Sequence, residues 1–270
     1  MTSFLFWNLN RKPLQKIVAN LALRYEVDVL MFVECSILPG VLLETLNQHR
    51  RAEYHYAPGL CKKVEIFTRY PRQFIEPIYE EDRLTIRNLK LPGAIDLLLA
   101  VTHFPSKLYW SDASQTAESI ELANSIRLAE KQASHSRTVL VGDLNMNPFE
   151  DGVVSANGLH GVMSRSIAEK GTRIVQAKEY PFFYNPMWSL FGDATPGPPG
   201  TYYYSKSEHK VFFWNIFDQV LIRPDLLSLF SNENMAILTS DGNISFLSSQ
   251  GVPDANIASD HLPIFFRLWL

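Results

Sequence analysis

Side chains that can bind a metal ion or a phosphate recur where apolar segments of this sequence begin or end. Asn8 and Asn10 follow the first such segment, Glu34 follows the second, and His103 follows residues 95–102. The same feature returns later in the chain at Asp143, Asn145, Asp218, Asp260 and His261. A carboxylate or an imidazole beside apolar residues is costly unless it is paired or bound to a ligand. Each of these side chains therefore requires a partner.

Each residue taken alone also has a purely structural interpretation. An acid such as Asp143 at a strand end often forms a turn, and a histidine such as His103 is often only hydrogen-bonded. Glu34 can be solvated, and Asn10 can be an ordinary loop residue. The repeated occurrence of such positions in one topological role favours a functional interpretation of the set.

The elements that must position these residues are short strands and dispersed helices. A helix is expected to open at Pro13, and a long one covers residues 112–134. We find no internal repeat and no linker, which indicates a single domain over residues 1–270. The economical arrangement is two sheets packed face to face with helices outside. Apolar segments predict strands at 4–8, 27–33, 63–68, 84–89, 95–102, 138–142, 217–223 and 264–268.

The composition is that of an ordinary globular protein. The 270 residues are 46% hydrophobic and 20% charged, with a net charge of −3. The net charge does not indicate a nucleic-acid partner, although a catalytic cleft needs only a local patch of basic residues. Two cysteines favour a reducing compartment, and we find neither a signal peptide nor an apolar run of the ~20 residues that span a bilayer. We expect a cytoplasmic enzyme with no membrane anchor; its oligomeric state is open.

Six segments together resemble the endonuclease/exonuclease/phosphatase superfamily, which includes DNase I. They are Trp-Asn-Leu-Asn at 7–10, Val-Glu at 33–34, Thr-His-Phe-Pro-Ser at 102–106, Gly-Asp-Leu-Asn-Met-Asn-Pro at 142–148, Phe-Asp-Gln-Val at 217–220 and Ser-Asp-His-Leu-Pro at 259–263. The resemblance implies an α/β fold, a four-layered α-β-β-α sandwich of two mixed sheets. It places the active site at one edge, where the sheets meet. One departure is Val33, since that superfamily usually has glutamine or asparagine before the metal-binding glutamate.

The resemblance also implies metal-dependent hydrolysis of a phosphodiester. Such a reaction must activate a water molecule and stabilise charge on the phosphate and the leaving group. Oxygen ligands select Mg²⁺ or Mn²⁺. Glu34 is the expected first metal ligand, and Asn8, Asn10 and Asp260 are expected to complete or orient its surroundings.

The catalytic residues implied by the resemblance are two acids, two histidines and an amide. Asp143 would orient or deprotonate the attacking water, and Asn145 would position the phosphate. Asp218 and His261 would form an acid–histidine pair in which the carboxylate raises the imidazole pKa. His103 would contact the phosphate as a second histidine.

The substrate-binding residues are expected in the aromatic-rich segment 180–217. Aromatic faces stack on bases in a sequence-tolerant way, and Trp188 and Tyr203 are the candidates for this role. Many of these rings can equally belong to the core. Ser106 can donate a hydrogen bond to the substrate or form a turn.

Three functions are compatible with these residues. The first is a nuclease that hydrolyses DNA or RNA. The second is a phosphoesterase that acts on a small molecule or a lipid headgroup, such as an inositol phosphate or sphingomyelin. The third is a degraded scaffold that only binds, and the complete set of acids and histidines argues against it.

Overall fold

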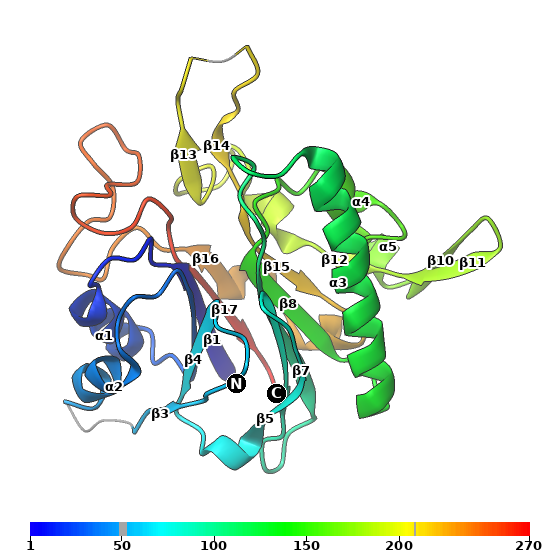
Figure 1. Ribbon diagram of the computed structural model, residues 1–270, viewed down its shortest axis with the longest axis horizontal. Helices are drawn as coiled ribbons and strands as arrows, with labels where there is room; N and C mark the ends of the chain where they lie inside the picture. The colour runs from blue at the N-terminus through cyan, green and yellow to red at the C-terminus, as the bar shows by residue number, and fades with distance from the viewer. Residues whose placement is uncertain (49–52, 208) are drawn as a thin grey trace.

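Two mixed β-sheets pack face to face, and helices cover their outer faces (Figure 1). The computed structural model describes residues 1–48, 53–207 and 209–270. Helices α1 and α2 lie outside one sheet, and α3 lies outside the other. The chain is therefore the four-layered α-β-β-α sandwich that the sequence predicts.

The first sheet contains both ends of the chain. Its strand order is β16-β17-β1-β2-β4-β3, and only the β1–β2 pair of its described strands is parallel. The strands are β1 (Thr2–Asn8), β2 (Val29–Val33), β3 (His55–Tyr56), β4 (Val64–Thr68), β16 (Met235–Ile237) and β17 (Ile264–Leu268); the helices are α1 (Gln15–Arg24) and α2 (Pro39–Asn47).

The second sheet comes from the middle of the chain. Its strand order is β5-β6-β7-β8-β15-β12-β9, with parallel pairs at β7–β8 and β12–β9. The strands are β5 (Ile75–Glu80), β6 (Leu84–Leu89), β7 (Leu97–His103), β8 (Thr138–Asp143), β9 (Gly161–Val162), β12 (Phe183–Tyr184) and β15 (Asp218–Ile222); the helices are α3 (Asp112–Ala133), α4 (Asp151–Val154) and α5 (Arg165–Ala168).

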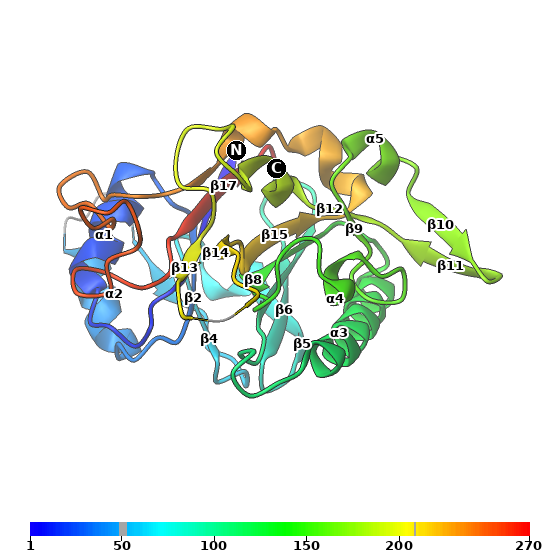
Figure 2. The ribbon, with the colours of Figure 1, turned by 90° about the horizontal axis from the view of Figure 1, so that it is seen from above.

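Two small hairpins project from the sandwich (Figures 1 and 2). One pairs β10 (Thr172–Val175) with β11 (Lys178–Pro181), and the other pairs β13 (Tyr202–Tyr204) with β14 (Phe213–Asn215). Short 3-10 helices connect the remaining elements: η1 (Arg72–Phe74), η2 (Pro186–Leu190), η3 (Pro224–Leu229) and η4 (Asn232–Asn234). Within the described ranges, no helix is long and apolar enough to cross a membrane.

The central strands are buried on both faces. In β1, Phe4 and Phe6 belong to the core between the sheets, whereas Leu5 and Trp7 pack in the core that contains α1. In the same way β7 directs Leu99 between the sheets and other residues toward α3. Such strands read as continuous apolar runs, which is why a polar residue at their ends stands out in the sequence.

Gly142 in β8 has no room for a side chain. A Cβ atom there would lie 2.1 Å from the backbone oxygen of Thr102, its register partner in β7. We expect Gly142→Ala to lower the free energy of unfolding by about 1–3 kcal/mol, because the two central strands must separate to admit it. Chemical denaturation measures this change. Gly40→Ala in α2 is the control, since nothing lies within 4 Å of a Cβ there; equal stability of the two variants would contradict the prediction.

Candidate active site

A cavity of about 1440 Å³ opens where the two sheets meet. The first sheet and its loops contribute four of the predicted residues to its walls, and the second contributes the others. The predicted residues that line it are Asn8, Glu34, His103, Ser106, Asp143, Asn145, Asp260 and His261. The fold therefore brings together positions that are up to 253 residues apart in the sequence.

Asp143 lies at the centre of this cluster and is 1% exposed. One carboxylate oxygen accepts a hydrogen bond from the Asn8 amide at 2.9 Å, and the other accepts from the backbone N–H of Asn145 at 2.9 Å. The Nε2 atoms of His103 and His261 lie 3.9 and 4.0 Å from Asp143 Oδ2. A buried carboxylate between two imidazoles is suited to orient a water molecule or accept its proton.

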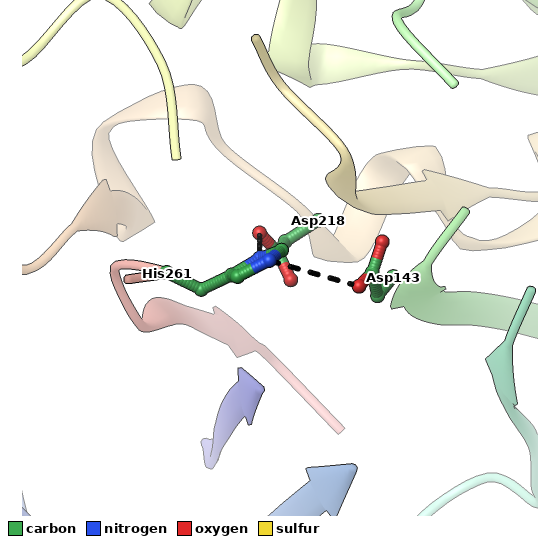
Figure 3. Close-up of side chains that lie close together, drawn as sticks. All are labelled: Asp143, Asp218 and His261. Atoms are coloured by element: carbon green, nitrogen blue, oxygen red, sulfur yellow. Dashed lines mark hydrogen bonds and ion pairs between the residues drawn. The ribbon is translucent and has the colours of Figure 1, made fainter. Parts of the chain in front are cut away.

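His261 and Asp218 form a buried pair (Figure 3). Nδ1 of His261 lies 2.8 Å from Asp218 Oδ2. The other ring nitrogen, Nε2, lies 4.0 Å from Asp143 Oδ2, and both residues line the cavity. Although burial lowers the pKa of His261, the nearby carboxylates of Asp218 and Asp143 outweigh it and raise this pKa to about 10. The imidazole is thus held as a cation that can face a phosphate oxygen.

Asn145 is held by its backbone and by its side chain. Its φ of 50° turns the chain directly after β8, and its Nδ2 donates to the carbonyl of Phe104 at 3.0 Å. The loop is fixed further by Asn147, whose Nδ2 donates to Asn215 Oδ1 and whose Oδ1 accepts from the N–H of Ile216. This network keeps the Asn145 amide at the cavity wall.

Glu34 directs its carboxylate into the cavity from the end of β2. Its φ of 47° breaks the strand, and its carbonyl accepts a hydrogen bond from the N–H of Arg11 at 2.8 Å. Its carboxylate oxygens lie 3.6 Å from His103 Nε2 and 3.7 Å from Arg11 Nε. Within the described part of the chain, no hydrogen bond shorter than 3.5 Å reaches this carboxylate, so its oxygens remain available to a ligand.

Four of the predicted residues do not line the cavity. Asp218 lies behind His261, and Asn10 donates its backbone N–H to Asn8 Oδ1 at 2.9 Å. The Trp188 ring packs 6.3 Å from Phe149, and Tyr203 packs against Trp214. Substrate binding by Trp188 and Tyr203 stays a prediction that their positions do not favour.

Other residues complete the site without having been predicted. Trp7 donates its indole N–H to the backbone oxygen of His261 at 2.8 Å, and the Ser259 hydroxyl donates to the backbone oxygen of Asn8 at 2.7 Å. Tyr202 lies in the cavity with its ring 4.7 Å from that of His261. The motifs contain Trp7 and Ser259, but only the three-dimensional contacts reveal what they hold.

Comparison with known proteins places this architecture in one family. Residues 5–261 match the Endonuclease/Exonuclease/phosphatase family, and the chain belongs to it. Members of this family are phosphoester hydrolases and generally depend on a divalent metal. No curated protein matches the chain significantly.

Solved structures share the fold at low sequence identity. A protein of the same family from Leptotrichia buccalis is 14% identical with a TM-score of 0.59, and the match covers 100% of both chains. The endonuclease domain of TRAS1, a telomere-specific non-LTR retrotransposon, is 15% identical (TM-score 0.54; 100% of this chain and 99% of that one). TDP2 from D. rerio, in complex with a single strand DNA product, is 14% identical (TM-score 0.55; 98% and 97%).

The side chains present fit a divalent cation. Asp143, Asp218 and His261 bring ligand atoms within 4.8 Å of one another, but Nδ1 of His261 is already shared with Asp218. Glu34 and Asp260 offer carboxylate oxygens in the same cavity, the donor type that Mg²⁺ and Mn²⁺ prefer.

We expect Asp218→Asn to lower the pKa of His261 by roughly 1–3 units, because the variant loses the carboxylate that stabilises the imidazolium and keeps the burial that opposes it. Titration of the His261 ring by NMR in the metal-free protein measures this shift. Asp225→Asn, beyond the other end of β15, is the control and should leave the titration unchanged. A His261 pKa equal in both variants would show that Asp218 does not hold the proton.

Proposed function

We propose that this protein is a divalent-metal-dependent phosphodiesterase that hydrolyses nucleic acid. The observation that carries the proposal is the contact set of Asp143: a buried carboxylate fixed by two amides, within 4 Å of two imidazoles, in an open cavity. One of those imidazoles is backed by a second carboxylate, that of Asp218. This arrangement supports the proposal because it offers a carboxylate for the attacking water and two imidazoles for the phosphate.

The proposed roles follow from the contacts. Asp143 orients the attacking water and accepts its proton, since its oxygens point into a site where Asn8 and Asn145 fix its rotamer. His261, as a cation, binds a phosphate oxygen as negative charge develops. His103 faces the same carboxylate from the adjacent parallel strand β7 and assists at the phosphate or the leaving group. Asn145 has a second amide hydrogen, beyond the one given to Phe104, for the phosphate.

Glu34 is the proposed metal ligand, with Asp260 and Asn8 around it. A bound Mg²⁺ or Mn²⁺ would supply Lewis-acid stabilisation of charge on the phosphate oxygens. The chain's own part is to hold the Glu34 carboxylate beside His103 and Arg11 without saturating it with hydrogen bonds. Asn10 supports this arrangement through its backbone contact with Asn8.

The size and lining of the cavity support a polymeric substrate. Pockets for drug-sized ligands typically measure about 300–1,000 Å³, and this one is larger. Its walls carry cationic side chains: Arg11, Lys62, Lys63, Arg83, Lys107, Lys206 and Lys210. The TRAS1 endonuclease and the DNA-bound TDP2 share the fold, which adds support for nucleic acid over an inositol phosphate or a sphingomyelin headgroup.

The direct test is turnover by the purified protein with Mg²⁺ or Mn²⁺. Linear and circular DNA, single-stranded RNA, sphingomyelin and a chromogenic phosphodiester serve as substrates. Cleavage of DNA or RNA that EDTA abolishes would support the proposal. Turnover of sphingomyelin or the chromogenic ester alone would replace nucleic acid with a small phosphoester as the substrate.

We expect Asp143→Asn and His261→Gln each to lower kcat by about 10²- to 10⁴-fold, because each removes a proton-transfer or charge-stabilising group at the phosphate. The melting temperature should be kept, and Asp225→Asn should retain full activity. Steady-state kinetics at saturating metal measure the effect. Wild-type rates in Asp143→Asn would exclude this carboxylate as the base.

We expect Glu34→Gln to raise the metal concentration needed for half-maximal activity by at least about tenfold, since a neutral amide replaces the anionic ligand. A titration of activity against Mg²⁺ measures this value. Glu65→Gln is the matched control, because Glu65 lines the same cavity from β4 but its carboxyl pKa is raised by burial. An unchanged metal dependence in Glu34→Gln would move the metal to other residues.

A further inference from the structure

One wall of the cavity is built from aromatic rings, most of them exposed. We call this the aromatic wall; it consists of Tyr109, Trp110, Phe149 and Phe212. Its parts come from three separate segments that touch: Lys107 pairs with Glu150, next to Phe149, and the Phe149 ring lies 5.2 Å from that of Phe212. The segments that carry the wall are therefore linked from the loop after β7 to the β13–β14 hairpin.

Three of the four rings of this wall are exposed although they are large, and Phe149 is half-buried. Tyr109 is 85% exposed, Phe212 47% and Trp110 37%. The rings of Trp188 and Phe191 lie 6.3 and 5.8 Å from that of Phe149 and support it. Apolar surface left open inside a catalytic cavity indicates a ligand that covers it.

The backbone is strained where it presents Phe212. Phe213, the next residue, has a φ of 63°, a conformation that costs a bulky side chain free energy and persists where the surroundings enforce it. This turn sends the two consecutive phenyl rings to different neighbours: Phe212 to Phe149, and Phe213 to Tyr203. Without it, a regular strand would not hold Phe212 at the wall in this way.

Two lysines lie beside aromatic rings that line the cavity. The ammonium of Lys210 lies 5.6 Å from the Phe212 ring centre, and that of Lys206 lies 5.7 Å from the Tyr204 ring centre. Both lysines line the cavity, on a chain whose net charge is −3. Seven basic and seven acidic side chains line the cavity, and Lys206 and Lys210 place two of the cations beside ring faces. Ammonium groups beside ring faces suit a phosphate backbone with unpaired bases. Base faces in a duplex are already stacked and cannot use these rings.

We propose that the preferred substrate is a single-stranded segment of nucleic acid whose bases stack on the aromatic wall beside the scissile phosphate. This rests on the proposed function in taking nucleic acid as the substrate class. Phe212 and Tyr109 are the specificity-determining residues, because they are the most exposed rings of the wall. The two lysines beside rings of the cavity, and the cavity that the wall shares with the catalytic cluster, favour this ligand over a lipid surface.

The test is equilibrium binding in EDTA, where cleavage cannot interfere. Fluorescence anisotropy compares a labelled single-stranded oligonucleotide, as DNA and as RNA, with a blunt duplex of the same sequence. We expect single strands to bind at least about tenfold more tightly. Phe212→Ala and Tyr109→Ala should weaken single-strand binding by about 5- to 100-fold, and Phe212→Trp should restore it.

The control is Trp269→Ala, an aromatic residue that is 57% exposed and lies outside the cavity lining. Its binding should equal that of wild type. Equal affinity for duplex and single strand, unchanged binding by Phe212→Ala, or binding only to phospholipid vesicles would overturn the inference. Single-strand binding with these variant effects but no cleavage in Mg²⁺ would sustain it and overturn the proposed function. Cleavage of duplex alone would sustain the proposed function and overturn the inference.

Discussion

The structure depends on two buried carboxylates that face each other across a strand pair. Asp143 ends β8 and Asp218 begins β15, and the two residues are register partners. Like charges opposite each other in a sheet destabilise it, and burial raises the cost. The protonated His261 between them supplies the compensating charge, at 2.8 Å from Asp218 and 4.0 Å from Asp143. The pair therefore requires a residue from the other sheet.

The packing of the two sheets is what supplies that residue. His261 lies shortly before β17 in the first sheet, whereas Asp218 begins β15 in the second sheet. The core between the sheets must therefore close before the imidazole can reach Asp218. A second link crosses at the same place, since Asn8 at the end of β1 donates to Asp143. The site is thus assembled by the inter-sheet core, and each sheet alone would hold an uncompensated fragment of it.

The sequence predicted the parts of the fold that carry strong apolar runs. The strands that bear Asn8, Glu34, His103, Asp143 and Asp218 appear near their expected positions, because these strands are buried on both faces. The β10–β11 hairpin could not be found in this way, since most of its residues are exposed and carry no periodic signal.

The aromatic residues around the site show where sequence patterns fail. Three consecutive tyrosines give no alternation of polar and apolar types, so the sequence does not indicate which face enters the cavity. In the structure Tyr202 and Tyr204 line the cavity, while Tyr203, which the sequence favoured, packs on Trp214. Strand geometry sends alternate residues to opposite sides, and only the register of the β13–β14 hairpin decides which.

Val33 departs from the usual amide of this family, and the fold gives a physical reason why Glu34 can still be positioned. Val33 is fully buried in the core between the sheets. Orientation of the next residue comes from the backbone instead: the φ of 47° at Glu34 and the hydrogen bond from the N–H of Arg11 turn its side chain out of the strand into the cavity. Arg11 itself has a φ of 57°, so two left-handed residues on adjacent loops hold the carboxylate. The backbone thus positions the Glu34 carboxylate without an amide side chain at residue 33. Val33 can therefore pack in the core between the sheets.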